Sequence, residues 1–169
     1  MHLILGTANW ARDGYGKRLE KDECFKILDQ AKALGIKTVA TAFDYGIEVV
    51  REYGWEDVLH KCEPWKISWN GASGVTLDRI IPGTSLLVPT LLMAPLNPLD
   101  YSFLPISNHR DVTFIARSIF CGGKLQRSNK EDVARLCFGF LKSHDVKNAV
   151  FGVESIEELE LNVRIANEK

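Results

Sequence analysis

Hydrophobic positions follow two different periods along the chain. Apolar side chains recur every three or four residues from Lys21 to Leu34, from Asn129 to Ser143 and after Ser155, which is the spacing of amphipathic helices. Short runs of small and β-branched apolar residues precede and separate these segments and predict strands. The predicted strands are His2 to Ala8, Ile36 to Ala42, Trp65 to Trp69, Leu86 to Leu96, Val112 to Ile119 and Asn148 to Val153. Strands that alternate with helices favour a parallel sheet or barrel.

Capping residues mark the ends of the predicted helices. Gly35 suits the position that stops the first helix, Ser128 or Asn129 can cap the next long one, and Ser155 can cap the last.

The remaining segments are shorter. A short helix is expected from Glu48 to Tyr53, and it could continue through Val58 and Leu59. Three glycines and a proline predict a connection from Gly71 to Gly83. Asp100 to Ile106 is expected to be irregular or helical.

Composition indicates an ordinary globular chain. With 169 residues, 46% hydrophobic and 25% charged, it fits one domain, residues 1–169. A net charge of -1 gives no electrostatic case for a nucleic-acid partner. The apolar run from Leu86 to Leu96 contains two prolines and is shorter than the about 20 residues that span a bilayer. Because the first residues do not resemble a signal peptide, we expect a cytoplasmic protein that does not bind membranes.

The four cysteines have no CxxC spacing and predict no metal site. We expect free buried thiols. Cys121 is the exception, because a glycine-rich turn could expose it.

The predicted strand from Ile36 to Ala42 ends in Phe43, Asp44, Tyr45 and Gly46. In α/β folds the carboxyl ends of parallel strands build the functional sites. Tyr45 and Asp44 are therefore candidate site residues.

Five segments in this order resemble the aldo-keto reductases, which are (β/α)8-barrel oxidoreductases that use a nicotinamide cofactor. The segments read LILGTANW, VATAFDYG, APLNPLD, ARSIFCGGKL and FGVESIEELELN. A complete barrel usually needs about 250 residues, so about two β-α units are expected to be absent, between Asn70 and Leu86. The resemblance thus implies an α/β fold of the TIM type that is contracted or open. A loop or a second copy of the chain would cover an open edge, so a homodimer is expected.

The resemblance places Tyr45 where the family has its proton-donating tyrosine. Ala40 stands at the position of the family's aspartate and Asn70 at that of its lysine, and the histidine would come from the missing fourth strand. Shifting the register could offer Lys66 as the lysine, but it lies at the opening end of its strand. Tyr45 is therefore either a residual donor or a plain turn residue, and Asp44 either a hydrogen-bonding or cation-binding group or a solvated turn acid.

The resemblance also implies a cofactor site at the ends of the last two strands. Its residues would be Ser118, Phe120, Gly122 and Lys124 near the pyrophosphate, Gly152 in the last strand, and Ser155, Glu158 and Asn162 toward the adenosine. An ordinary Gly-Gly turn, helix capping by Ser155 and solvent exposure of the others explain the same residues. Glu154 stands where the family often has a basic residue for the 2′-phosphate of NADP, and its charge would repel that phosphate.

Three functions remain open from the sequence. The first is an aldo-keto-reductase-like protein with lost or much reduced carbonyl reductase activity, which keeps a site for NAD, NADP or a small anion. The alternatives are a working oxidoreductase that uses Tyr45, or a non-catalytic binding or assembly scaffold. The sequence identifies neither the substrate nor the partner.

Overall fold

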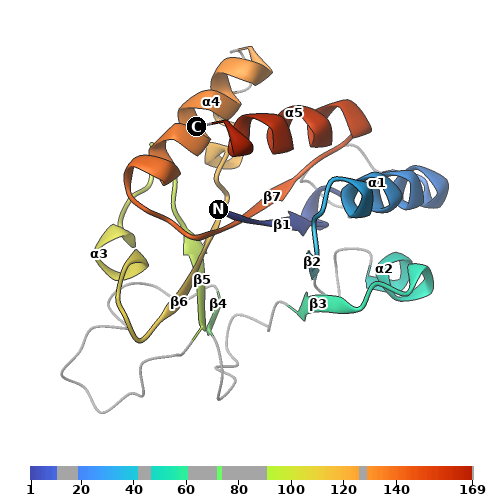
Figure 1. The fold of residues 1–169 in the computed structure, drawn as a ribbon, viewed down its shortest axis with the longest axis horizontal. Coiled ribbons are helices and arrows are strands. Elements are labelled where there is room, and N and C mark those ends of the chain that lie inside the picture. The colour runs from blue at the N-terminus through green and yellow to red at the C-terminus, as the bar shows by residue number, and fades with distance from the viewer. Residues whose placement is uncertain (11–18, 42–46, 61–71, 74–90, 126–128, 169) are drawn as a thin grey trace. The chain divides into compact units, whose positions relative to one another are not determined.

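A computed structural model describes residues 1–10, 19–41, 47–60, 72–73, 91–125 and 129–168. Strands and helices alternate along the chain (Figure 1), which confirms the predicted α/β class. The chain divides into two compact units. One contains residues 1–2 and 62–149, and the other contains residues 3–61 and 150–169. The two are named here by their longest segments, the unit of residues 62–149 and the unit of residues 3–61.

The unit of residues 3–61 builds a parallel sheet from the first strands of the chain. Ile4 of β1 (His2–Gly6) lies opposite Thr38 of β2 (Thr38–Thr41), and β2 pairs in parallel with β3 (Asp57–His60). Its helices are α1 (Lys21–Ala33), α2 (Ile47–Tyr53) and α5 (Ile156–Asn167), and a 3-10 turn spans Ala8–Trp10.

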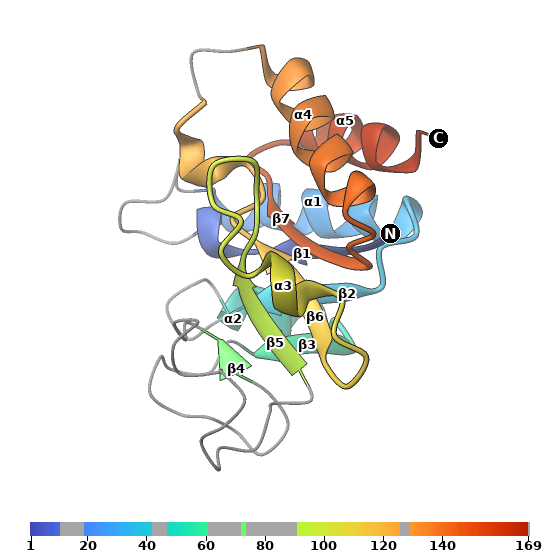
Figure 2. The same ribbon diagram turned by 90° about the vertical axis from the view of Figure 1, so that its left-hand side faces the viewer.

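The unit of residues 62–149 also contains parallel strands and helices. Its described strands are β4 (Ala72–Ser73), β5 (Leu91–Pro95) and β6 (Thr113–Arg117), followed by the start of β7 (Asn148–Gly152), and neighbouring strands pair in parallel. Its helices are α3 (Leu104–Ser107) and α4 (Lys130–Ser143), and a 3-10 turn spans Cys121–Gly123. Figure 2 shows β5 and β6 side by side in this unit.

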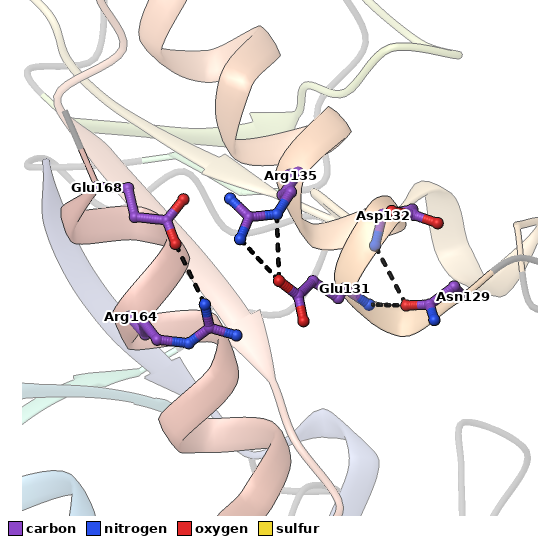
Figure 3. A network of polar contacts seen from close by, with 6 residues as sticks. All are labelled: Asn129, Glu131, Asp132, Arg135, Arg164 and Glu168. Atoms are coloured by element: carbon purple, nitrogen blue, oxygen red, sulfur yellow. Dashed lines mark hydrogen bonds and ion pairs between the residues drawn. The ribbon is translucent and has the colours of Figure 1, made fainter.

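Two long helices begin and end where their capping residues predict. Asn129 Oδ1 accepts hydrogen bonds from the backbone N–H groups of Glu131 and Asp132, at 2.8 and 3.4 Å, so Asn129 caps α4 (Figure 3). Gly35 has a φ of 80° directly after the C-terminal end of α1. Only glycine adopts this left-handed conformation without cost, so both predictions are confirmed.

Arginine–carboxylate pairs add i,i+4 contacts along two helices. Arg135 Nη2 lies 2.7 Å from Glu131 Oε1 in α4, and Arg164 Nη1 lies 3.3 Å from Glu168 Oε1 at the end of α5 (Figure 3). All four side chains are more than a third exposed, so each pair stabilises its helix by only about 0.3–0.5 kcal/mol.

Each unit buries its own apolar core. In the unit of residues 3–61 the stripe of α1, which includes Ile27 and Leu28, is as deeply buried as Leu5 and Val39 of the strands. In the unit of residues 62–149, Phe138 of α4 is fully buried together with strand residues such as Leu92 and Ala116. Burying one such large side chain stabilises the fold by about 1.5–3 kcal/mol. Within the described residues no helix is long and apolar enough to cross a membrane.

The helix α2 is held on α1 by Tyr53. Its hydroxyl donates to Asp29 Oδ1 at 2.5 Å, and Lys32 Nζ lies 4.5 Å from the centre of the Tyr53 ring. Burial and the adjacent carboxylate raise the pKa of Tyr53 to about 12. The phenol therefore stays protonated and keeps donating at neutral pH.

Two predicted assignments change in the structure. The helix that begins after Gly46 does not continue to Val58 and Leu59, because Gly54 turns the chain with a φ of 74° and residues 57–60 form β3. Within the predicted connection, Ala72–Ser73 pairs with Leu92 and Met93 as β4. The strand predicted from Trp65 to Trp69 lies outside the described residues, and of the predicted strand from Leu86 to Leu96 the structure describes β5.

Gly6 allows a close approach between β1 and β7. A Cβ atom at Gly6 would lie 2.8 Å from Val150 Cγ1 and 3.4 Å from the carbonyl oxygen of Phe151. Valine is branched at Cβ and cannot swing away freely. The position therefore requires glycine for space.

We expect Gly6→Ala to lower the free energy of unfolding by about 1–3 kcal/mol, the usual cost of overpacking. Gly139→Ala is the matched control, because Gly139 lies within α4 and an added Cβ meets no atom within 4 Å. It should raise the free energy of unfolding by about 0.5–1 kcal/mol. Thermal unfolding of both variants measures the contrast. Equal midpoints for Gly6→Ala and the unmodified chain would show that β1 and β7 are not packed this closely.

Candidate functional site

The carboxyl ends of β1 and β2 carry a buried pair of hydroxyl groups. Thr7 Oγ1 donates to Thr41 Oγ1 at 2.8 Å, and the backbone N–H of Thr7 donates to the carbonyl oxygen of Ala40 at 3.0 Å. Both threonines are at most 1% exposed. The two buried hydroxyl groups therefore bond to each other and tie the ends of β1 and β2 together.

Ala40 is the position at which the sequence resemblance expects an aspartate. It is the third residue of β2 and is 9% exposed. Nearby, Trp10 is 5% exposed, and its indole Nε1 donates to the carbonyl oxygen of Val153, just after β7, at 3.2 Å. At this end of the strands Ala40 contributes a methyl group and Trp10 an indole ring, neither of which carries a charge.

The candidate catalytic residues themselves are not placed. Tyr45 and Asp44 lie outside the described residues, as do Asn70 and Lys66. Their assignments stay predictions.

Among the described residues of its unit, the loop after β6, residues 118–124, contains most of the left-handed backbone. The φ angles are 52° at Ser118, 60° at Cys121, 60° at Gly122 and 76° at Gly123. The loop is closed by backbone hydrogen bonds that include Cys121 N–H to Ser118 O at 3.0 Å and Lys124 N–H to Cys121 O at 3.2 Å. A Cβ at Gly122 would meet nothing within 4 Å, so glycine is favoured there by its φ alone. Open space beside the backbone is what close approach of an anion requires.

The side chains of this loop face in two directions. Ser118 and Lys124 are exposed, as is Gly122. Phe120 instead packs edge to face on Phe138 of α4, with the ring centroids 5.7 Å apart. Three of the four predicted pyrophosphate residues thus reach solvent, while the fourth anchors the loop.

Asn97 supports this loop, and the sequence analysis did not single it out as a site residue. It lies in the connection after β5, is 4% exposed, and donates from Nδ2 to the carbonyl oxygen of Ser118 at 3.0 Å. Its Oδ1 accepts from the N–H groups of Leu99 and Asp100, both at 2.9 Å. The available signal was the run Asn-Pro-Leu-Asp, because an asparagine before such a turn often bonds the backbone two residues on.

Cys121 is buried, at 4% exposure, so the prediction of an exposed thiol is wrong. The left-handed φ at Cys121 sets it within a compact 3-10 turn. Burial, together with its contact with Cys121, raises the pKa of Cys137 to about 12, and burial raises that of Cys24 to about 11. These two thiols therefore stay protonated at neutral pH. Because the thiolate is the form that acts as a nucleophile or metal ligand, neither thiol is suited to these roles. Among the described residues, no cluster of three His, Cys, Asp or Glu side chains could hold a metal ion.

The predicted adenosine residues lie after β7, in the other unit. Ser155 caps α5 as predicted, because its Oγ accepts from the N–H of Glu158 at 3.3 Å. Glu158 Oε2 in turn accepts from the N–H of Glu154 at 2.8 Å. Asn162 is 6% exposed, so solvent exposure does not explain it. Gly152 is the last residue of β7.

The first turn of α5 is strongly acidic. Glu157 and Glu158 lie in it and Glu154 directly precedes the capping serine. A hydrogen bond from Ser155 lowers the pKa of Glu157, so that carboxylate is ionised at neutral pH. A second anion placed at this helix end would meet negative charge and N–H groups that are already bonded.

Comparisons with known proteins give a match in structure and none in sequence. No family model matches the chain, and no curated protein matches it. A protein from Pseudomonas aeruginosa assigned as an aldo-keto reductase matches with a TM-score of 0.67 and 15% identity, over 98% of this chain and 89% of that one. The holo form of the aldo-keto reductase AKR11C1 from Bacillus halodurans matches with a TM-score of 0.63 and 15% identity, over 99% and 87%. A variant of Gox0644 in complex with NADPH matches with a TM-score of 0.67 and 12% identity, over 99% and 84%.

The fold is that of the aldo-keto reductases. The predicted α/β fold of a shortened TIM type is confirmed, and so is the aldo-keto-reductase-like assignment at the level of fold. At sequence identities of 12–15%, the structural matches establish the fold. They do not establish the reaction, since one fold can host many functions.

We expect Ser155→Ala to lower the free energy of unfolding of this aldo-keto-reductase-like chain by about 1 kcal/mol, because α5 loses its cap. Ser155→Asn should restore stability, since asparagine caps equally well. Chemical denaturation of both variants tests the assignment. If Ser155→Asn is as unstable as Ser155→Ala, the hydroxyl has a role other than capping.

Proposed function

We propose that this chain is an aldo-keto-reductase-like protein that has lost most carbonyl-reducing activity and keeps a site for a nucleotide or small anion. The observation that carries the first part is Ala40, a buried methyl group at the place that the sequence resemblance assigns to an aspartate. In that resemblance the aspartate pairs with a lysine that lowers the pKa of the proton-donating tyrosine. A phenol without a neighbouring cation has a pKa near 10 and is a slow acid at neutral pH, and the resemblance predicts this situation for Tyr45.

The anion-binding part is supported by the loop of residues 118–124. Exposed Lys124 supplies a positive charge, Ser118 a hydroxyl, and the left-handed backbone around Gly122 an open approach. Arg117 Nη1 lies 3.3 Å from Ser118 Oγ and adds a second cation beside the loop. These groups fit a pyrophosphate or a single phosphate.

A nicotinamide dinucleotide is the cofactor that this proposal favours, because the similar Gox0644 structure is a complex with NADPH. When bound, such a cofactor would supply the hydride for reduction of a carbonyl group. The resemblance places Glu154 where the family often has a basic residue for a 2′-phosphate, and the charge of Glu154 and of the acidic first turn of α5 would repel that phosphate. We therefore propose NADH rather than NADPH as the preferred form.

The second candidate is a non-catalytic binding or assembly protein. It is favoured by the closed Thr7–Thr41 pair and by Trp10, which fill the strand ends with hydrogen-bonded and apolar groups. In either case we expect a cytoplasmic homodimer in which the second copy covers surface that a complete barrel would bury.

Titration of NADH and NADPH, followed by cofactor fluorescence, tests the anion site. We expect NADH to bind more tightly than NADPH, and Lys124→Ala to weaken NADH binding by about tenfold through the loss of one charge-assisted contact. Lys26→Ala is the control, an exposed lysine on α1. The absence of binding at millimolar cofactor would leave the scaffold function, and a marked preference for NADPH would contradict the role given to Glu154.

Tyr45→Phe tests the residual chemistry. If Tyr45 is the proton donor, the variant should lose at least 100-fold in the rate of carbonyl reduction, the usual contribution of a general acid. Consumption of NADH with small aldehydes provides the measurement. Equal rates for the variant and the unmodified chain would remove Tyr45 from the reaction, and binding of NADH by both would show that the cofactor site is independent of it.

A further inference from the structure

Asn97 uses both ends of its amide to connect two neighbouring strand ends. Its Oδ1 accepts from Leu99 N–H and Asp100 N–H in its own turn, and its Nδ2 donates to the carbonyl oxygen of Ser118 in the next loop. An asparagine side chain offers two donor hydrogens and one carbonyl oxygen. No other uncharged side chain of this length can accept twice and donate in the opposite direction.

The turn that carries Asn97 is rigid. Asn97 N–H donates to Asp100 O at 2.9 Å and Asp100 N–H donates to Asn97 O at 3.1 Å, so the turn is closed by paired backbone bonds. It begins directly after β5, where Pro95 lies opposite Arg117 of β6 and Leu96 N–H donates to Arg117 O at 3.2 Å. The parallel register therefore brings Asn97 level with the beginning of the loop of residues 118–124.

The carbonyl group that accepts from Asn97 belongs to a strained residue. Ser118 has a φ of 52°, which a residue with a side chain adopts only where the surroundings hold it. Its carbonyl oxygen also accepts from Cys121 N–H at 3.0 Å and so begins the 3-10 turn. The hydrogen bond from the buried Asn97 amide to the Ser118 carbonyl oxygen fixes the orientation of the peptide group between residues 118 and 119. The rest of the loop follows from this peptide group.

We propose that Asn97 is a positioning residue for the phosphate loop of residues 118–124, which it holds in its left-handed conformation through the carbonyl group of Ser118. Asn97 does not itself touch the anion. It sets the direction of the backbone at Gly122 and of the exposed Lys124, which are the groups that would meet a phosphate. This inference rests on the proposed anion site for its functional meaning, but the restraint on the loop is a separate physical claim.

The substitution Asn97→Asp tests the donor role of the amide separately from its acceptor role. The introduced carboxylate can still accept from Leu99 and Asp100, so the turn is retained, but it cannot donate to Ser118 and instead places negative charge beside its carbonyl oxygen. We expect amide hydrogen exchange in residues 119–124 to become at least tenfold faster, and NADH and inorganic phosphate to bind about tenfold more weakly. Exchange by mass spectrometry and cofactor fluorescence measure the two effects.

Asn148→Asp is the matched control. Asn148 Nδ2 donates to the carbonyl oxygen of Phe114 at 3.0 Å, so the same replacement removes the same type of bond near the opposite end of β6. We expect neither the exchange of residues 119–124 nor the binding of NADH to change. An equal effect of both replacements would overturn the proposal, because it would show general destabilisation of β6.

Acid rescue distinguishes a lost donor from a lost fold. Below the pKa of the introduced carboxyl, its O–H can donate to Ser118 again, so slow exchange should return in Asn97→Asp at low pH after correction for the intrinsic rate. Asn97→Ser serves if the charged variant does not fold, since serine can accept within the turn but is too short to reach Ser118. It should show fast loop exchange at every pH.

The outcomes separate this inference from the proposed function. If the unmodified chain binds neither NADH nor phosphate, the proposed function fails, while faster exchange in Asn97→Asp still supports the restraint. If binding occurs and Asn97→Asp retains full affinity, the positioning role is overturned. Unchanged exchange in both Asn97→Asp and Asn97→Ser would overturn the restraint itself.

Discussion

Parallel pairing between neighbouring strands is the constraint on which the rest of the structure depends. In a parallel pair both carboxyl ends lie at the same edge, so residues far apart in the sequence become neighbours without any local signal. In the unit of residues 3–61 this brings Thr7 to Thr41. In the unit of residues 62–149 it brings Asn97 to Ser118. The strand register decides which side chains lie at each strand end, and therefore which hydrogen bonds form there.

The two strand-end regions differ in what they leave available. Thr7, Thr41, Ala40 and Trp10 are buried, and each makes a hydrogen bond within the protein. The loop after β6 instead exposes Ser118 and Lys124 on a backbone that is held in a left-handed conformation. The two regions therefore differ in the polar groups that each exposes.

The acidic start of α5 contains residues with an observed structural role at positions where the resemblance expects cofactor contacts. Ser155 and Glu158 fall where the family resemblance expects contacts with the adenosine half of a cofactor, yet their hydrogen bonds cap the helix. Capping does not exclude ligand contact. A replacement at Ser155 nevertheless removes the cap of α5 and lowers the free energy of unfolding, whether or not a ligand binds there. Asn162 is different, because it is buried in α5 and takes no part in the cap.

The sequence by itself determined the alternation of strands and helices, the caps at Asn129 and Ser155, and the glycine that ends α1, because these depend on residues a few positions apart. The five family-like segments also predicted the fold correctly. Only the tertiary structure decided that Cys121 is buried, that Asn162 is not exposed, and that residues 57–60 form a strand. It also revealed Asn97, whose partner lies 21 residues away. Such contacts depend on strand register, which no local pattern records.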